Sequence, residues 1–266
     1  MNFKTITYEV RDYLCWITLN DPQRRNAISL EMVDDLTTCL RHFDQDSSVR
    51  VFILRGAGRA FSAGGNVKDM LNKTGMFEGE PFELRRRYEL GIQQIPKTIE
   101  ALNKPIIAMV NGAAIGAGCD LAFMCDMRIL CEHSKFGETF SKLGLLPGVG
   151  GTYFLTRAVG YSKAMQMFLT GDIFSGEEAY KMGLGNYFTT SENLEILTER
   201  VASKVASNAP EAIQLTKRIL KSSLRRELED QLNILAAYQS MAQRMDDHFE
   251  GVNALLEKRS AEFKGE

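Results

Sequence analysis

Two glycine-rich stretches of the chain could present backbone N–H groups to a ligand. The first, residues 61–67 (FSAGGNV), follows an apolar run, and so does the second, residues 111–120 (NGAAIGAGCD). Glycine adopts backbone conformations that other residues avoid and lets a ligand approach the chain closely. The second stretch runs into an apolar segment suited to a buried helix, whose first N–H groups are unpaired and favour negative charge. Two such donors converging on one oxygen would form an oxyanion hole.

Buried strands are needed to deliver the chain into these turns. The apolar runs at 51–55, 106–110 and 127–131 predict such strands. Residues 3–19 alternate between apolar and polar and predict an edge or early strand. Because strand, turn and helix recur over the first half of the chain, we expect an α/β fold.

Helix signals surround and follow this region. Ser29 is placed to cap a helix, and Ser175 with Glu178 has the spacing of a capping box. The polar segment 70–103 predicts a helix that ends before Lys104-Pro105, and the pattern is mainly helical from residue 161 onward.

Composition excludes several classes of function. The 266 residues, 44% of them hydrophobic, suffice for one enzyme-sized globular unit. A net charge of −2 argues against binding nucleic acid, and no apolar run approaches the ~20 residues needed to span a membrane. The five cysteines form no Cys-x-x-Cys pair and are typical of reduced, buried thiols. We therefore expect a cytoplasmic protein that binds neither nucleic acid nor membrane.

Other catalytic chemistries have weak support. The three histidines, His42, His133 and His248, are scattered, so we expect no metal site. The spacing of residues 112–118 does not fit a dinucleotide fingerprint, and no phosphate-binding loop is present. Cys119 could suggest a nucleophile, but no positioned base is evident in the sequence.

Several motifs in order closely resemble the enoyl-CoA hydratase/isomerase family, the crotonase superfamily. They are residues 104–126 (KPIIAMVNGAAIGAGCDLAFMCD), 136–138 (FGE), 142–152 (KLGLLPGVGGT) and the ending at 250–259 (EGVNALLEKR). The resemblance covers almost the whole chain. It implies an α/β spiral core of repeated β-β-α units, residues 1–195, which holds the acyl-CoA site. It also implies that residues 196–266 form a C-terminal helical region for trimerisation and active-site cover.

The resemblance also implies where an acyl-CoA thioester binds. The oxyanion hole would consist of the N–H groups of Gly65 and Ala117, and no cofactor is expected beyond the coenzyme A of the substrate. A lysine near the C-terminus can come from a neighbouring subunit of a homotrimer or a dimer of trimers. The residues implied for CoA binding are Arg24, Arg25, Ala27, Ala63, Asn66, Val67, Lys68 and Lys258. The alternative for the basic residues is an ordinary set of solvated surface charges.

The chain departs from the family at the acidic positions. Family hydratases use two glutamates, and the matching residues here are Asp120 and Phe140, so Phe140 is expected to line the acyl pocket. Other members place an aspartate directly after the Leu-Pro step, where this chain has Gly148. The nearest replacement for the missing acid is Glu138. We therefore predict Asp120 and Glu138 as catalytic, the alternatives being a helix cap for Asp120 and a solvated or structural carboxylate for Glu138.

The function predicted from these residues is hydration of a 2-enoyl-CoA, or the reverse dehydration. Double-bond isomerisation and decarboxylation remain alternatives, as does an acyl-CoA-binding protein with reduced catalysis. Residues 77–103 could contribute Glu83, Arg85, Tyr88 or Glu89 to the acyl pocket, and the sequence does not select among them. The acyl chain, the pathway and the choice between trimer and hexamer also stay open.

Overall fold

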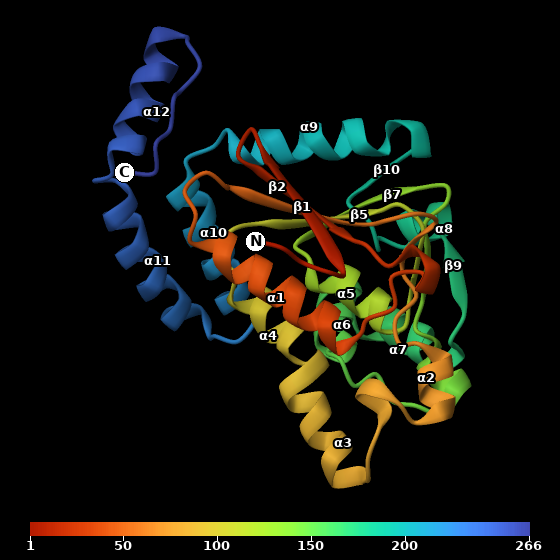
Figure 1. The fold of residues 1–266 in the computed structure, drawn as a ribbon. Coiled ribbons are helices and arrows are strands. Elements are labelled where there is room, and N and C mark those ends of the chain that lie inside the picture. The colour runs from red at the N-terminus through yellow and green to blue at the C-terminus, as the bar shows by residue number, and fades with distance from the viewer.

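A computed structural model describes all residues, 1–266, and contains two β-sheets (Figure 1). The strands of the six-stranded sheet, in spatial order, are β1 (Ile6–Arg11), β2 (Leu14–Leu19), β3 (Val51–Gly56), β5 (Ile106–Val110), β7 (Met127–Cys131) and β10 (Tyr187–Thr189). Those of the four-stranded sheet are β4 (Ala60–Ser62), β6 (Ala113–Ile115), β8 (Lys135–Gly137) and β9 (Ile173–Ser175).

The chain passes repeatedly from the larger sheet to the smaller one. β3 leads into β4, β5 into β6, and β7 into β8, and a helical segment follows each pair. These strands pair in parallel within both sheets. The expected spiral of β-β-α units is confirmed, and the predicted strands at 51–55, 106–110 and 127–131 are β3, β5 and β7.

Helices cover both faces of the six-stranded sheet. Figure 1 shows α9 lying across one face, with α1 and α4 on the other. The larger apolar core lies on the side of α1 and α4, and a smaller one lies under α9. The helices of this body are α1 (Leu30–Asp44), α2 (Val67–Asn72), α3 (Pro81–Arg87), α4 (Gln94–Ala101), α5 (Ala117–Met124), α6 (Gly151–Val159), α7 (Tyr161–Thr170), α8 (Gly176–Lys181) and α9 (Leu194–Ala206).

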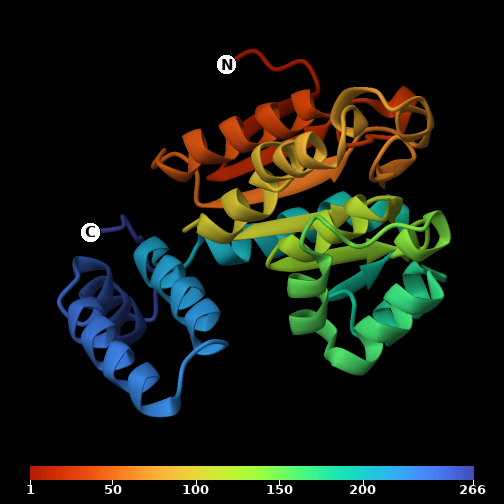
Figure 2. The ribbon, with the colours of Figure 1, turned by 90° about the horizontal axis from the view of Figure 1, so that it is seen from below.

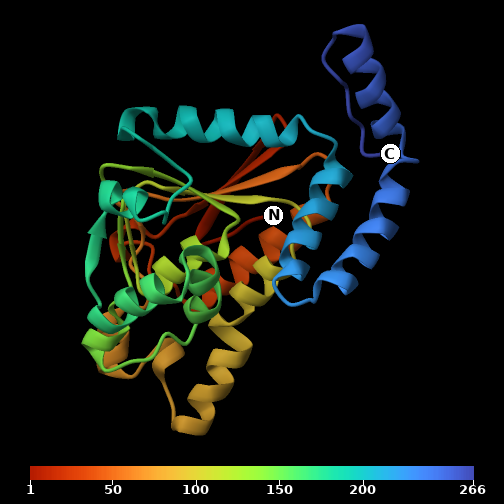
Figure 3. The same ribbon diagram turned by 180° about the vertical axis from the view of Figure 1, so that it is seen from behind.

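Three further helices form a group beside this body, as Figures 2 and 3 show. They are α10 (Pro210–Ser223), α11 (Leu228–Ala242) and α12 (Asp246–Glu257). Arg50 connects the last segment to the sheet by donating hydrogen bonds to the carbonyls of Ala206 and Phe263, at 2.9 and 2.6 Å. No helix is both long and apolar enough to cross a membrane.

Two predicted elements differ from the structure. Residues 3–19 form two antiparallel strands, β1 and β2, instead of one. Their turn uses Asp12 and Tyr13 with φ of 50° and 64°, a conformation usually supplied by Asn-Gly, so the sequence carried no ordinary turn signal. The predicted helix over 70–103 is broken into α2, α3 and α4, with a kink at Gly91 between α3 and α4.

The predicted capping box at the start of α8 is present. Ser175 Oγ accepts the N–H of Glu178 at 3.3 Å, and Glu178 Oε2 accepts the N–H of Ser175 at 2.9 Å. Ser175→Ala removes one acceptor and is expected to lower the free energy of unfolding by about 1 kcal/mol in denaturant titration. Ser175→Asp keeps an N-cap acceptor and should retain most of the stability. Equal stability of the alanine variant and the wild type would contradict this.

Candidate active site

The two glycine turns lie side by side because the short strands next to them pair. β4 and β6 run parallel, so the turns that follow them leave the same edge of the sheet. A Cβ added at Gly64 would lie 3.0 Å from the nitrogen of Ala117. Gly64 also has a φ of +75°, which favours glycine. The structure therefore brings the two predicted halves of the oxyanion hole together.

Both turns leave backbone N–H groups open. Gly65 donates no hydrogen bond to the protein. Ala117 is the first residue of α5, so its N–H has no partner within the helix. The first N–H bonded within this helical turn is that of Asp120, which donates to the carbonyl of Gly116 at 2.9 Å. With the positive end of the α5 dipole, the N–H groups of Gly65 and Ala117 suit an oxygen that gains negative charge.

Asp120 and Glu138 form a pair of carboxyl groups in the interior. Asp120 lies in the first turn of α5, Glu138 directly follows β8, and both residues have 0% exposure. None of the four oxygens of these carboxyl groups has a hydrogen-bond partner in the protein. The N–H of Gly151 lies near Asp120 and favours its ionised form without completing a bond.

The pKa values of both carboxyl groups are raised. Burial raises the pKa of Asp120 to about 7. Burial, and then the negative charge of Asp120, raise the pKa of Glu138 well above its usual range. The closeness of the two groups favours the ionised form of Asp120 and the protonated form of Glu138. At neutral pH Glu138 therefore keeps its proton, and Asp120 is the first of the two to ionise.

These observations exclude one alternative each for Asp120, Glu138 and Cys119. Asp120 does not cap α5, because its oxygens accept no hydrogen bond from the N–H groups of the helix. Glu138 is not solvated. Burial and the charge of Glu138 raise the pKa of the Cys119 thiol well above its usual range, so this thiol stays protonated and is a poor nucleophile.

Gly151 and Phe140 shape the space around the carboxyl pair and the oxyanion turn, and the sequence predicted only part of this. A Cβ at Gly151 would overlap Oδ1 of Asp120, so the start of α6 approaches the carboxyl only as glycine. The available signal was the Gly150-Gly151 pair after Pro147, whose purpose the sequence did not reveal. The end of the Phe140 ring lies 3.7 Å from a Cβ built at Gly116. An apolar ring therefore borders the oxyanion turn.

The early residues predicted to bind CoA lie along the first glycine turn. Ala63 donates its N–H to the carbonyl of Arg25 at 3.0 Å, and Ile28 donates to Gly64 at 2.8 Å. Arg24 and Arg25 are exposed next to this connection. Asn66 caps α2 by accepting the N–H of Lys68, and both Val67 and Lys68 are exposed. Ala27 is buried behind the turn.

Lys258 is not brought to this site within one chain. It is exposed and ends α12 in the left-handed conformation. Figures 1 and 3 show α12 and α2 on opposite sides of the molecule. Any contact of Lys258 with a ligand at the glycine turns would therefore require a second subunit.

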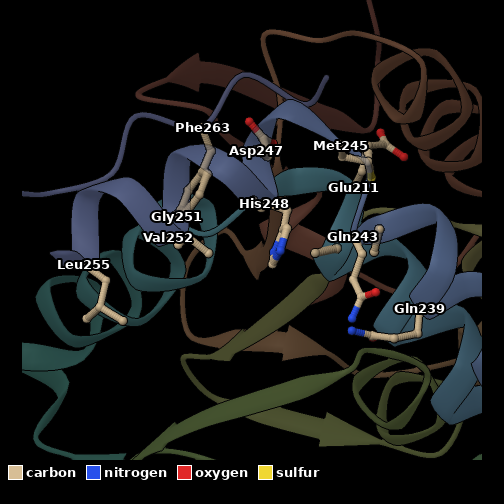
Figure 4. A pocket seen from close by; sticks show the side chains of 13 residues that line it. Glu211, Gln239, Gln243, Met245, Asp247, His248, Gly251, Val252, Leu255 and Phe263 are labelled. Carbon is tan, nitrogen blue, oxygen red and sulfur yellow. The ribbon is translucent and has the colours of Figure 1, made fainter.

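A cavity of about 380 Å³ lies between α10, α11, α12 and the C-terminal tail, away from the carboxyl pair (Figure 4). Its lining contains two acids, and both accept hydrogen bonds from the chain: Glu211 from the side chain of Gln214, and Asp247 from the N–H groups of Lys264 and Gly265. No group of three His, Cys, Asp or Glu side chains in the protein is arranged to hold a metal ion. The candidate site is therefore made of the glycine turns and the carboxyl pair.

The buried pair is expected to destabilise the fold as pH rises. Because both folded-state pKa values are raised, the folded protein binds more protons than the unfolded chain above about pH 4, so stability falls as pH rises through 7. Asp120→Asn and Glu138→Gln should each raise Tm relative to wild type, by more at about pH 8 than at about pH 5. Each kcal/mol gained corresponds to about 2–4 °C. Thermal unfolding at both pH values checks this, and a gain that does not grow with pH would contradict it.

Comparisons with known proteins show the family of this chain. The family model for enoyl-CoA hydratase/isomerase matches residues 9–266. The chain is 36% identical to the 1,2-epoxyphenylacetyl-CoA isomerase of Escherichia coli, over 94% of each chain. It is 33% identical to the crotonyl-CoA hydratase of Syntrophomonas wolfei, over 99% of each. The crystal structure of an enoyl-CoA hydratase from Bacillus anthracis superposes with a TM-score of 0.92 at 30% identity, covering 99% of this chain and 100% of that one. The chain therefore belongs to the enoyl-CoA hydratase/isomerase family of enzymes, the crotonase superfamily.

Proposed function

We propose that this enzyme hydrates a 2-enoyl-CoA thioester and catalyses the reverse dehydration. The observation that carries the proposal is the buried pair of Asp120 and Glu138, both with raised pKa values, beside the open N–H groups of Gly65 and Ala117. Hydration needs one group that takes a proton from water and one that gives a proton to carbon. A pair that holds one proton supplies both.

The pKa order assigns the two roles. The thioester carbonyl accepts hydrogen bonds from Gly65 and Ala117, which stabilise the enolate that forms when oxygen adds to C3. Asp120, the carboxyl with the lower pKa, takes the proton of the attacking water. Glu138 gives its proton to C2, and the proton taken up by Asp120 restores the pair. Dehydration follows the same steps in reverse.

A second candidate within the family is movement of the double bond. Phe140 offers no acid at the position where family hydratases have their second glutamate, and one relative is named as an isomerase. A pair that takes a proton from one carbon and returns it to another would suffice for isomerisation. Decarboxylation would use the oxyanion hole alone.

Product analysis with matched thioesters separates these reactions. We expect a 3-hydroxyacyl-CoA from a 2-enoyl-CoA, and neither rearrangement of the matching 3-enoyl-CoA nor loss of carbon dioxide from a malonyl-type thioester. A 2-enoyl-CoA formed from the 3-enoyl isomer, with no hydroxyacyl product, would replace hydration by isomerisation. Binding without entry of solvent deuterium into any acyl chain would leave only an acyl-CoA-binding role.

We also propose that CoA lies along the first glycine turn. Exposed Arg24, Arg25 and Lys68 suit its phosphates, and Ala63, Asn66 and Val67 line the same stretch. The buried Ala27 lies behind this turn. Lys258 would approach the bound CoA from a neighbouring subunit. Weaker CoA binding by Arg24→Ala and Arg25→Ala at low salt would support this placement.

The C-terminal helices suit assembly into a homotrimer or a dimer of trimers. Large apolar side chains on α10, α11 and α12 are exposed in the single chain, among them Leu220, Leu224, Leu228, Leu232, Leu255 and Leu256. Such surfaces are typical of interfaces. We propose residues 196–266 as the assembly region, although α9, within this range, packs on the sheet. We also propose the cytoplasm as the compartment, because all five thiols are free and buried. Light scattering gives the number of subunits.

A further inference from the structure

The side chain of Tyr88 occupies the space next to Gly148. A Cβ built at Gly148 would lie 3.1 Å from Cε1 and 3.6 Å from Cδ1 of the Tyr88 ring. Gly148 directly follows Leu146-Pro147, the step after which some family members carry an aspartate. In this chain the phenol ring of Tyr88 therefore occupies the place next to Gly148 where such a side chain would begin.

The backbone around Tyr88 holds the ring in this place. Tyr88 begins the segment Tyr88–Ile92, which joins α3 to α4 and is kinked at Gly91, whose φ of −102° and ψ of −111° are not helical. Gln93, directly after this segment, donates from Nε2 to the carbonyl of Gly148 at 2.9 Å. The ring and this hydrogen bond together connect the segment to the Gly148 loop.

The Gly148 loop leads directly to the carboxyl pair. Gly151, three residues further on, is the glycine whose Cβ would overlap Asp120. Three residues of extended chain span at most about 10–11 Å. Gly148, against which Tyr88 packs, therefore lies within this distance of Gly151, the glycine next to the Asp120 carboxyl. This distance suits the part of an acyl group that extends beyond the reacting double bond.

The Tyr88 hydroxyl has no partner in the protein. The residue is half-buried, and burial alone raises the pKa of its phenol, with no hydrogen bond contributing to the shift. The hydroxyl is therefore protonated at neutral pH and available as a donor. The protein does not enclose the hydroxyl, so water reaches it and a ligand oxygen can take the place of that water.

The charges near Tyr88 favour a neutral acceptor over a carboxylate. On the same segment, Arg85 is paired with Glu89 at 2.9 Å. Arg87 donates to the carbonyl of Gly75 at 3.2 Å and pairs with Glu78 at 3.4 Å. Arg86 is two residues away on the helix and points to a different side from Tyr88. A ligand carboxylate bound at Tyr88 would thus give up hydration by water and find no unpaired positive side chain to replace it.

We propose that Tyr88 is a specificity-determining residue, whose hydroxyl donates a hydrogen bond to a neutral oxygen carried by the acyl group beyond its reacting double bond. The oxygen belongs to a hydroxyl, keto or ether group. This inference rests on the proposed function, because it places the acyl group of a CoA thioester between the oxyanion hole and Tyr88.

The test compares thioesters that differ only in this oxygen. Wild type and Tyr88→Phe are assayed with 2-enoyl-CoAs of equal length, with and without a hydroxyl or keto group at C4, C5 or C6. We expect wild type to prefer at least one oxygenated thioester, and Tyr88→Phe to lower kcat/KM for it by about 2–13-fold, since one hydrogen bond contributes about 0.5–1.5 kcal/mol. The unsubstituted thioester should be unaffected. Tyr161→Phe, at an exposed tyrosine, is the matched control.

Each outcome bears on the inference. Equal effects of Tyr88→Phe on both kinds of thioester, or no preference of wild type for oxygen, would reduce Tyr88 to packing and overturn it. If wild type turns over none of the thioesters, the proposed function fails, and calorimetric binding of the saturated thioesters still tests Tyr88. Loss of an oxygen-dependent gain in affinity in Tyr88→Phe would then support the inference, and unchanged affinities would overturn it.

Discussion

Replacing Asp120 by asparagine is expected to lower kcat for hydration by about 10²–10⁴-fold, the usual contribution of a positioned acid or base. Asparagine keeps the shape of the side chain but cannot accept the proton of water. Because the carboxyl makes no hydrogen bond to the helix, the change leaves the oxyanion turn intact. Steady-state kinetics with the best 2-enoyl-CoA should show the loss in kcat, with KM largely retained.

Two further variants show whether the loss belongs to the pair. Glu138→Gln should lower kcat similarly, and the double variant should cost about as much as either single one, because residues that act as a unit are not additive. Asp34→Asn, at an exposed carboxyl on α1, should leave kcat unchanged. Unchanged turnover in Asp120→Asn would remove Asp120 from the chemistry.

Ala117→Pro is expected to lower kcat by about 10²–10³-fold, the cost of removing one oxyanion donor. Proline has no N–H, and its ring is tolerated at the first position of a helix, where Ala117 lies. The variant therefore deletes the donor and keeps the rest of α5. Kinetics measured alongside thermal unfolding separate the loss of the donor from any loss of fold.

Ala117→Gly is the matched control for this deletion. It keeps the N–H and removes only a methyl group, so its kcat should stay within a few-fold of wild type. A proline variant that is folded and as active as the glycine variant would show that Ala117 does not hold the carbonyl oxygen.

The parts of the fold that sequence reasoning predicted well carry local signals. The strands β3, β5 and β7 are mostly apolar runs, interrupted only by Arg55 in β3 and Arg128 in β7. The caps at Ser29 and Ser175 depend on residues three positions apart. The β1–β2 hairpin was missed because Asp12 and Tyr13 adopt positive φ without glycine, held by the pairing of the two strands.

The site shows the same division between local and tertiary information. The glycine turns could be recognised because each follows a buried strand. That Glu138 is buried against Asp120 depends on β8 lying next to β6, which no spacing along the chain encodes. The contact of Tyr88 with Gly148 joins residues 60 positions apart, so the sequence could only name Tyr88 among several candidates.

The measurement that tests hydration most directly is mass spectrometry of the products formed in heavy-oxygen water from short, long, branched and aromatic 2-enoyl-CoAs. The proposal predicts that at least one thioester gains one labelled water and becomes a 3-hydroxyacyl-CoA, and that Asp120→Asn forms this product at least about 10²-fold more slowly. Binding of the thioesters without gain of labelled water by any of them would contradict it.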